Sequence, residues 1–240
     1  MKGSTEKQSY VAEYADLLLK GRLWGARFGA PLESLFTQHS STVSAHRNRL
    51  FVLCAAMAIM VFAFIDPLAG PSVDTISMIL RLGVIVPMLL LLLVCTFFGR
   101  FQDAQHPLLM VTCLVIAVIN ILIMRLSDEP GAIHYHGLLI LTFVFGNLLL
   151  RVPFWYAMGW TVPVFVLYGV FYNVLQFGSE PAMLMYYSIL VFVVGVASLI
   201  ANYEADIQTR RDYLRQIVLT HEKEKSERAR QEFHRVAMVD

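Results

Sequence analysis

The sequence predicts an all-α membrane protein with six transmembrane helices, and three observations lead to this fold class. Hydrophobic residues make up 57% of the 240 residues and charged residues only 15%, whereas a soluble domain carries about a quarter charged residues. The apolar residues gather in runs of roughly the twenty residues that a helix needs to cross a bilayer. The final stretch, residues 202–240, is highly charged, contains neither Pro nor Gly, and therefore favours one long helix.

The chain divides into three predicted parts. Residues 1–48 form a cytoplasmic lead-in that begins with a short amphipathic helix at residues 8–23. Residues 49–202 form the six-span membrane domain, and residues 203–240 form a cytoplasmic helix. The first residues lack an apolar core, so we expect no cleavable signal peptide.

Each predicted span is an apolar run bounded by charged or turn-forming residues. The first ends at Asp66, and the second is interrupted by Arg81 and Pro87. The six spans are expected at residues 50–65, 75–97, 107–124, 134–150, 154–177 and 182–201.

The distribution of basic residues orients these spans. Of the 19 Lys and Arg residues, all except Arg81 and Arg125 lie before residue 50, in the loops at Arg100 and Arg151, or in the C-terminal helix. Basic residues are concentrated on the cytoplasmic side of membrane proteins. The pattern therefore predicts that both termini are cytoplasmic and that Arg81 and Arg125 lie toward the outer side.

The short loops and the absence of common catalytic motifs exclude several function classes. We find no phosphate-binding glycine loop, nucleophile elbow, HExxH motif or zinc-binding cysteine spacing, and no basic aromatic surface for nucleic acid. The three cysteines, Cys54, Cys95 and Cys113, lie inside apolar runs and are interpreted as small core residues. Any signal from outside must therefore be received by the spans themselves.

Ionisable residues within or beside spans are costly and indicate candidate sites. The predicted ligand-binding residues share the outer half of the first four spans: Asp66, Arg81, Arg125, Asp128, His134 and His136. For Arg81 two interpretations remain open. It either snorkels or pairs with Asp66, or it joins Arg125 in a pocket for a small or lipidic anionic ligand. A metal or haem at His134 and His136 is also open, although residues two apart point about 200° apart on a helix.

Other polar and aromatic residues of the spans are expected to have structural roles. Asn120, Asn147 and Asn173 are interpreted as hydrogen-bond partners between helices. Trp155 and Trp160 are expected to anchor the fifth span at the inner membrane surface.

The C-terminal helix is predicted to relay a signal. Apolar residues recur at Ile207, Leu214 and Ile217 in a heptad pattern, which predicts a parallel dimer helix for about two heptads and a weaker seam after Leu219. The expected relay residues are Asn202, Tyr203, Glu204, Ile207, Arg211, Leu214, Ile217 and His221. Expected ion pairs at helical spacing are Asp206–Arg210, Glu224–Arg228, Glu227–Arg230 and Glu232–Arg235. A single solvated helix is the alternative.

Several segments together resemble the six-span input domain of bacterial membrane-bound nucleotide cyclases, above all diguanylate cyclases with a GGDEF domain. The similarity covers nearly the whole chain and includes Asp66. The similar segments are RFGAPLESLF, LRLGVIVP, LLLRVPFWYAMG, ANYEADIQTRRDYLRQIVL and the final FHRVAMVD.

This resemblance implies a sensory module of the bacterial inner membrane. It further implies a homodimer that transmits a signal through the C-terminal helix to a cyclase domain, which makes cyclic di-GMP and is expected after Asp240. GTP and Mg²⁺ are expected only for that domain, and no cofactor is expected in this chain. An adenylyl cyclase or histidine kinase could replace the GGDEF domain. A small transporter or channel, or a membrane scaffold that recruits a soluble partner, remain the alternative functions.

Overall fold

The computed structural model describes residues 28–69, 74–98, 104–126, 129–150, 152–170 and 181–237. All elements within these ranges are helices, which confirms the predicted all-α class. The predicted amphipathic helix at residues 8–23 lies outside the described residues. The chain forms two compact units, Thr37–Glu204 and the pair of segments Met1–Phe36 and Ala205–Asp240. We refer to them as the bundle unit and the terminal unit.

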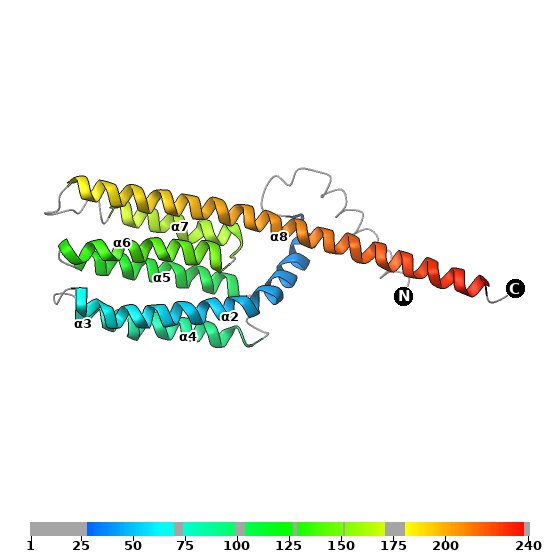
Figure 1. Cartoon of the computed structure of the whole chain (residues 1–240), viewed down its shortest axis with the longest axis horizontal. Coiled ribbons are helices and arrows are strands. Elements are labelled where there is room, and N and C mark those ends of the chain that lie inside the picture. The colour runs from blue at the N-terminus through cyan, green and yellow to red at the C-terminus, as the bar shows by residue number, and fades with distance from the viewer. Residues whose placement is uncertain are drawn as a thin grey trace. The chain divides into compact units, whose positions relative to one another are not determined.

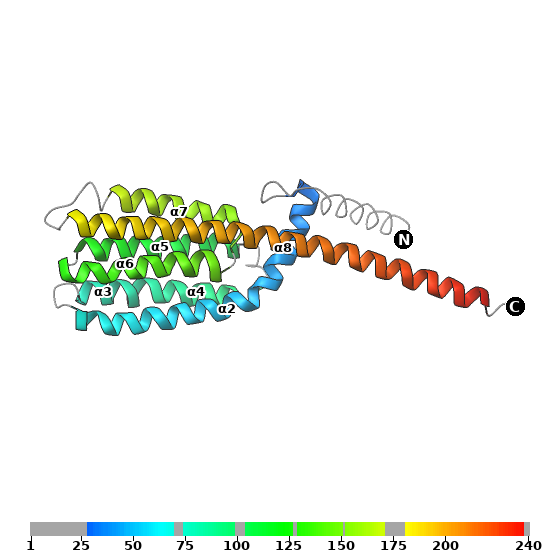
Figure 2. The same ribbon diagram turned by 45° about the horizontal axis from the view of Figure 1, so that its top comes forward.

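The helices of the bundle unit run side by side, as the views in Figures 1 and 2 agree. The α-helices are α2 (Ala30–Ala69), α3 (Asp74–Leu80), α4 (Val86–Cys95), α5 (Gln105–Leu126), α6 (Glu129–Val144), α7 (Phe154–Tyr168) and α8 (Pro181–Ala237). Two π-helical segments, η1 (Arg81–Ile85) and η3 (Phe145–Leu149), continue α3 into α4 and extend α6. The helix α2 begins in the terminal unit and continues into the bundle unit, and α8 begins in the bundle unit and continues into the terminal unit.

Among the described residues, four helical segments are long and apolar enough to cross a membrane. They are Arg47–Ile65, Thr75–Cys95, Gln105–Leu126 and Met185–Gln231, whose apolar part lies at its start. They correspond to the first, second, third and sixth predicted spans. The fourth and fifth correspond to the shorter apolar helices Tyr135–Leu149 and Phe154–Tyr168, and their crossing stays a prediction.

The helix that carries the first span extends beyond the predicted span at both ends, although the apolar span Arg47–Ile65 itself ends where it was predicted to end. The lead-in and the span form one helix of 40 residues, and this helix continues past Asp66 and Pro67 to Ala69. A proline this close to the end of a helix removes one hydrogen bond of the last turn, so the helix can run on for a few residues. Arg49 of α2 also donates to the Thr96 carbonyl at 2.6 Å, where a cation favours the C-terminus of α4.

The second span carries the π-helical turn η1 directly before Pro87. The Val86 amide bonds the carbonyl of Arg81, five residues back, and Pro87 is near the start of α4. Proline has no N–H, and its ring clashes with the carbonyl four residues earlier. The wider turn relieves this conflict. The interruption predicted at Arg81 and Pro87 is therefore a π-bulge within a continuous span.

Large apolar side chains from these helices form one core. Trp160 is fully buried and stacks on Phe143 with ring centroids 5.3 Å apart. The prediction of an interface anchor was therefore wrong for Trp160, because α7 turns this ring toward the bundle. Trp155 is 43% exposed, as an anchor would be.

Candidate functional site

Arg81 is the most deeply buried charged residue among the predicted ligand-binding positions. Its exposed fraction is 0%, so it does not snorkel to the surface. Its Nε donates to Ser77 Oγ at 3.2 Å, and its guanidinium lies over the Tyr135 ring at 5.7 Å. The first residue of η1 thus places a cation inside the bundle unit, and π-bulges often occur at functional sites.

His136, the neighbour of Tyr135 on α6, lies in an aromatic environment. The His136 ring is 1% exposed, 4.9 Å from the Tyr187 ring and 6.1 Å from the Tyr168 ring. The Tyr168 and Ser188 hydroxyls are hydrogen-bonded at 3.3 Å. Together these contacts link α6, α7 and α8 at the end of the bundle unit that includes Arg81 and Tyr135.

The other predicted ligand residues do not join this group in the described part of the chain. Arg125 lies exposed in the last turn of α5. Asp128 and the side chains of Asp66 and His134 lie outside the description, so the pairing of Arg81 with Asp66 stays a prediction. Within the described ranges, no three His, Cys, Asp or Glu residues lie close enough to hold a metal ion.

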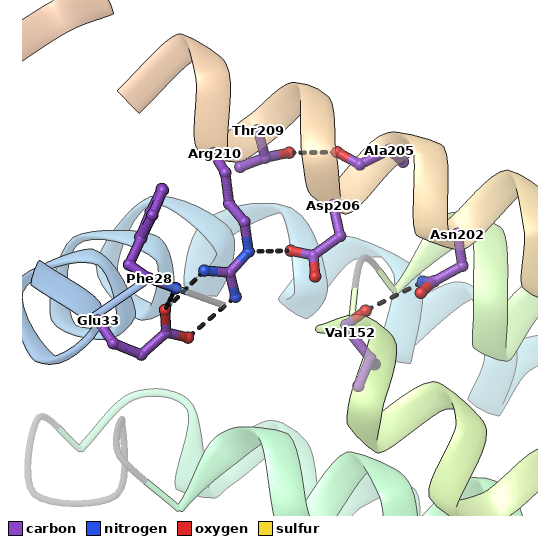
Figure 3. A network of polar contacts seen from close by, with 8 residues as sticks. All are labelled: Phe28, Glu33, Val152, Asn202, Ala205, Asp206, Thr209 and Arg210. Carbon is purple, nitrogen blue, oxygen red and sulfur yellow. Dashed lines mark hydrogen bonds and ion pairs between the residues drawn. The ribbon is translucent and has the colours of Figure 1, made fainter. Parts of the chain in front are cut away.

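A second polar group, which we call the Asn147 node, connects η3, α7 and α8. The Asn147 amide donates to Ser198 Oγ at 2.9 Å and to Thr161 Oγ1 at 3.3 Å. Asn202 Nδ2 donates to the carbonyls of Asn147 at 2.7 Å and Val152 at 3.0 Å, the latter bond drawn in Figure 3. The Asn147 carbonyl belongs to η3 and the Val152 carbonyl to the segment just before α7, so Asn202 supplies a donor to two carbonyls near these helix ends.

The prediction that asparagines bond between helices is confirmed at two of three positions. Asn147 bonds as described above, and Asn120 Nδ2 of α5 donates to Thr142 Oγ1 of α6 at 3.3 Å. Asn173 lies outside the described residues.

A third group, the Arg210 clamp, lies in the terminal unit and joins α8 to the start of α2. Arg210 is 3% exposed and donates through both terminal nitrogens to the Glu33 carboxylate, at 2.7 and 3.0 Å (Figure 3). Its Nε lies 3.4 Å from Asp206. The guanidinium also lies over the rings of Phe36 at 4.4 Å and Phe28 at 5.0 Å.

Apolar contacts continue the clamp along α8. Leu32 packs against Leu214, and both are buried. Phe36 contacts Tyr213 edge-on, with ring centroids 5.4 Å apart. Partial burial raises the pKa of Tyr213, because it disfavours the charged phenolate. Side chains from the segment 28–36 therefore cover the part of the predicted heptad seam that carries Arg210, Leu214 and Ile217.

The predicted relay residues differ in their contacts and in their burial. Asn202 belongs to the Asn147 node, and Tyr203 lies edge-on to the Phe154 ring at 5.0 Å. Ile207 and Leu214 are buried and Ile217 is half-buried, whereas Glu204 and Arg211 are exposed. His221 is half-buried.

The predicted helical ion pairs are partly confirmed. Asp206–Arg210 and Glu224–Arg228 form at 3.4 and 3.5 Å. Glu227 lies 4.0 Å from Lys223 in place of Arg230. The side chains of Glu232 and Arg235 lie outside the description.

Sequence reasoning missed the partner of Arg210. Arg210 falls in the heptad frame at a position that a coiled coil fills with an apolar residue, and the pattern of α8 alone does not show that Glu33, far away in the sequence, pairs with it. The signal available was the pattern F-x₄-E-x₂-F at residues 28–36, which places an acid between two aromatic rings.

Comparison with protein families finds a match. The sequence model of MASE8, a family of membrane-associated sensory domains, matches residues 71–219. The match begins after α2 and ends within α8, one residue beyond Val218, which packs in the clamp. Comparison with curated proteins and with solved structures gave no match.

Proposed function

The chain belongs to the MASE8 family of membrane-associated sensory domains, and we propose that it transmits a membrane signal through α8 to a cytoplasmic nucleotide cyclase. The most specific form of this proposal is a GGDEF diguanylate cyclase that makes cyclic di-GMP. The observation that carries it is α8, a single helix from Pro181 to Ala237 with no break at Asn202. The helix α8 thus contributes residues to both the Asn147 node and the Arg210 clamp.

The proposal includes a topology with six spans, in which both termini are cytoplasmic and the membrane is the bacterial inner membrane. The position of the basic residues supports it, because nearly all of them lie at one side of the predicted spans. In this topology Arg81 and His136 lie in the outer half, where a small or lipidic ligand would arrive, and the clamp lies in the cytoplasm.

We also propose that the chain works as a homodimer through its spans and α8. The heptad pattern supports this, but Ile207, Arg210 and Leu214 are buried in the terminal unit, where residues 28–36 cover this face. Pairing of two α8 helices along this seam therefore requires residues 28–36 to leave it. The clamped and paired arrangements form a two-state element that a signal can bias.

An electrostatic substitution tests the clamp without truncating the chain. Glu33→Arg places a second cation against Arg210 and should release residues 28–36. In a chain with Ala at Cys54, Cys95 and Cys113, we expect Leu214→Cys to form few disulfides between subunits in liposomes, and Glu33→Arg to increase them several-fold. A cysteine at exposed Arg211 is the matched control off the seam. Equal cross-linking at Leu214 with and without Glu33→Arg would contradict the proposal that residues 28–36 and a second α8 helix compete for the same face of α8.

A fusion tests the output function. The chain is joined after Asp240 to a diguanylate cyclase domain, reconstituted in liposomes and supplied with GTP and Mg²⁺. A bias of about 1–3 kcal/mol changes an equilibrium roughly 5–150-fold, so Glu33→Arg should change the rate of cyclic di-GMP formation at least fivefold. Leu219→Pro, which breaks α8 after the clamp, should abolish this difference. Identical rates for the parent fusion and Glu33→Arg would contradict the proposal.

A further inference from the structure

A half-open cleft of about 70 Å³ lies between α2, α4, α5, α6 and η3 of the bundle unit. Its walls are almost entirely apolar, with side chains such as Ile59, Leu89 and Phe145. The volume is about five times the roughly 10–15 Å³ that one water needs, so a ligand group of several heavy atoms fits. The oxygen and nitrogen atoms of its side chains come from three residues, Thr112, Asn120 and Thr142.

The two threonine hydroxyls have already used their protons. Thr112 Oγ1 donates to the Leu108 carbonyl and Thr142 Oγ1 to the Leu138 carbonyl, each at 2.8 Å. A hydroxyl group carries one proton and two lone pairs. Toward any other group in the cleft, both oxygens therefore act only as acceptors.

This accounting fixes the orientation of the Asn120 amide. The Asn120 group next to Thr142 Oγ1, at 3.3 Å, must be the donor Nδ2, because Thr142 has no proton left to give to an oxygen. The Asn120 carbonyl oxygen Oδ1 is then the free acceptor. The side chain is 1% exposed, and Oδ1 has no hydrogen-bond partner among the described residues.

We propose that this cleft binds a lipid-soluble molecule whose apolar body carries a hydroxyl donor, such as a phenol or an alcohol. The hydroxyl donates to Asn120 Oδ1, and the apolar body occupies the rest of the cleft. The role of this ligand as the stimulus rests on the proposed function, whereas the binding of the ligand to the cleft is independent of that function.

Other occupants fit the cleft less well. None of the described residues that line it is a Lys or Arg, so an anion finds no counter-charge among them. An ether or ester of the same shape carries only hydrogen-bond acceptors, so it cannot donate to Asn120 Oδ1. A helix of a second copy brings no free main-chain donor, because its amides are bonded within the helix. The hydroxyl donor is what distinguishes the proposed ligand from these.

Trp160 provides an internal probe of the cleft. Its ring lies against Gly146, where an added Cβ would be 2.6 Å from Cζ2, and Gly146 lines the cleft. In a full chain with Phe at Trp24 and Trp155, in nanodiscs of saturated lipid, a brominated ligand should quench Trp160. We expect saturable quenching by para-bromophenol and at least about tenfold weaker quenching by para-bromoanisole, its methyl ether, because the ether forms no bond to Oδ1.

Two substitutions separate recognition of the donor from general partition. Asn120→Leu should weaken para-bromophenol binding about tenfold and remove its preference over the ether. Asn48→Leu, which deletes another buried asparagine that is not among the residues lining the cleft, is the matched control and should change neither. If Asn120→Leu does not fold, Thr142→Val tests the same point. This substitution removes the acceptor of Asn120 Nδ2, so the amide can rotate. The preference for the phenol over the ether should therefore decrease.

Two results would overturn the proposal. Saturable but equal quenching by the phenol and the ether, unchanged in Asn120→Leu, would identify a purely apolar lipid groove. Quenching by the phenol that rises without saturation would show that the molecule only partitions into the bilayer. Neither measurement uses an output domain, so a failed cyclase fusion leaves the binding result interpretable.

Discussion

At the residue scale, each candidate group centres on a buried polar side chain that contacts at least one other segment of the chain. Arg81 contacts Ser77 and Tyr135, Asn202 bonds two carbonyls, and Arg210 forks onto Glu33. A buried charge or amide is tolerated only where it is paired, so each of these contacts also fixes how its helices meet. Changing one partner should therefore alter local stability more than changing an exposed charge.

Asn202→Ala should destabilise the bundle unit by about 2 kcal/mol. The change leaves the carbonyls of Asn147 and Val152 buried without their donor, and each such loss costs about 1–3 kcal/mol, so two losses at the lower end of this range give about 2 kcal/mol. Denaturant unfolding in detergent, followed by tryptophan emission, measures this difference. Glu204→Ala, two residues away and exposed, is the control and should stay within about 0.5 kcal/mol. Equal effects of the two changes would argue against the node.

Arg210→Lys should loosen the clamp although it keeps the charge. Lysine has no planar fork to hold both oxygens of Glu33 and stacks less well between Phe28 and Phe36. Hydrogen exchange of the amides of residues 28–36 should become at least several-fold faster. Arg215→Lys, at a side chain 65% exposed, is the matched control and should leave exchange unchanged. Unchanged exchange in both variants would rule out a clamp that depends on the guanidinium.

At the element scale, small residues set how closely helices approach. A Cβ added at Gly195 of α8 would lie 2.4 Å from the Phe165 ring of α7, which is itself packed between Phe143 and Phe192. Such close approach at glycine is typical of helix pairs in membranes. The aromatic neighbours leave Phe165 little room to move away.

Gly195→Ala should therefore destabilise the bundle unit by about 1–3 kcal/mol, as overpacking does. Gly137→Ala on α6 is the matched control, since nothing lies within 4 Å of its added Cβ. That control should be neutral or slightly stabilising, because alanine is the better helix former. Thermal unfolding in one detergent measures both. A neutral Gly195→Ala would mean that α7 and α8 are not in such close contact.

At the scale of the whole molecule, composition and hydrophobic runs predicted the helical class and four of the six spans, which coincide with helices long and apolar enough to cross a membrane. Periodicity also selected the correct face of α8, since Ile207 and Leu214 are buried. It could not identify what covers that face, because Glu33 and Arg210 are 177 residues apart and only the folded chain brings them together. The π-helical form of η1 could not be predicted either, because Pro87 indicates an interruption of the helix but not the geometry of that interruption.

Reporter fusions test the proposed topology of the whole chain. A reporter active only outside the cytoplasm, fused after Asp128, should be active, and the same reporter fused after Arg151 should be inactive. The excess of Lys and Arg on the inner side is the physical reason. Equal activity at both positions would mean that residues 129–150 do not cross the membrane.

The central claim is that α8 carries the signal as one helix, and insertions into it test this claim most directly. Alanines are inserted after Leu219 in the cyclase fusion, and the change caused by Glu33→Arg in cyclic di-GMP formation is measured. Two residues turn the downstream helix by about 200°, whereas seven turn it by about 20° from register. We predict that the response is lost with two alanines and kept with seven. A response that is the same for both insertions would contradict the account.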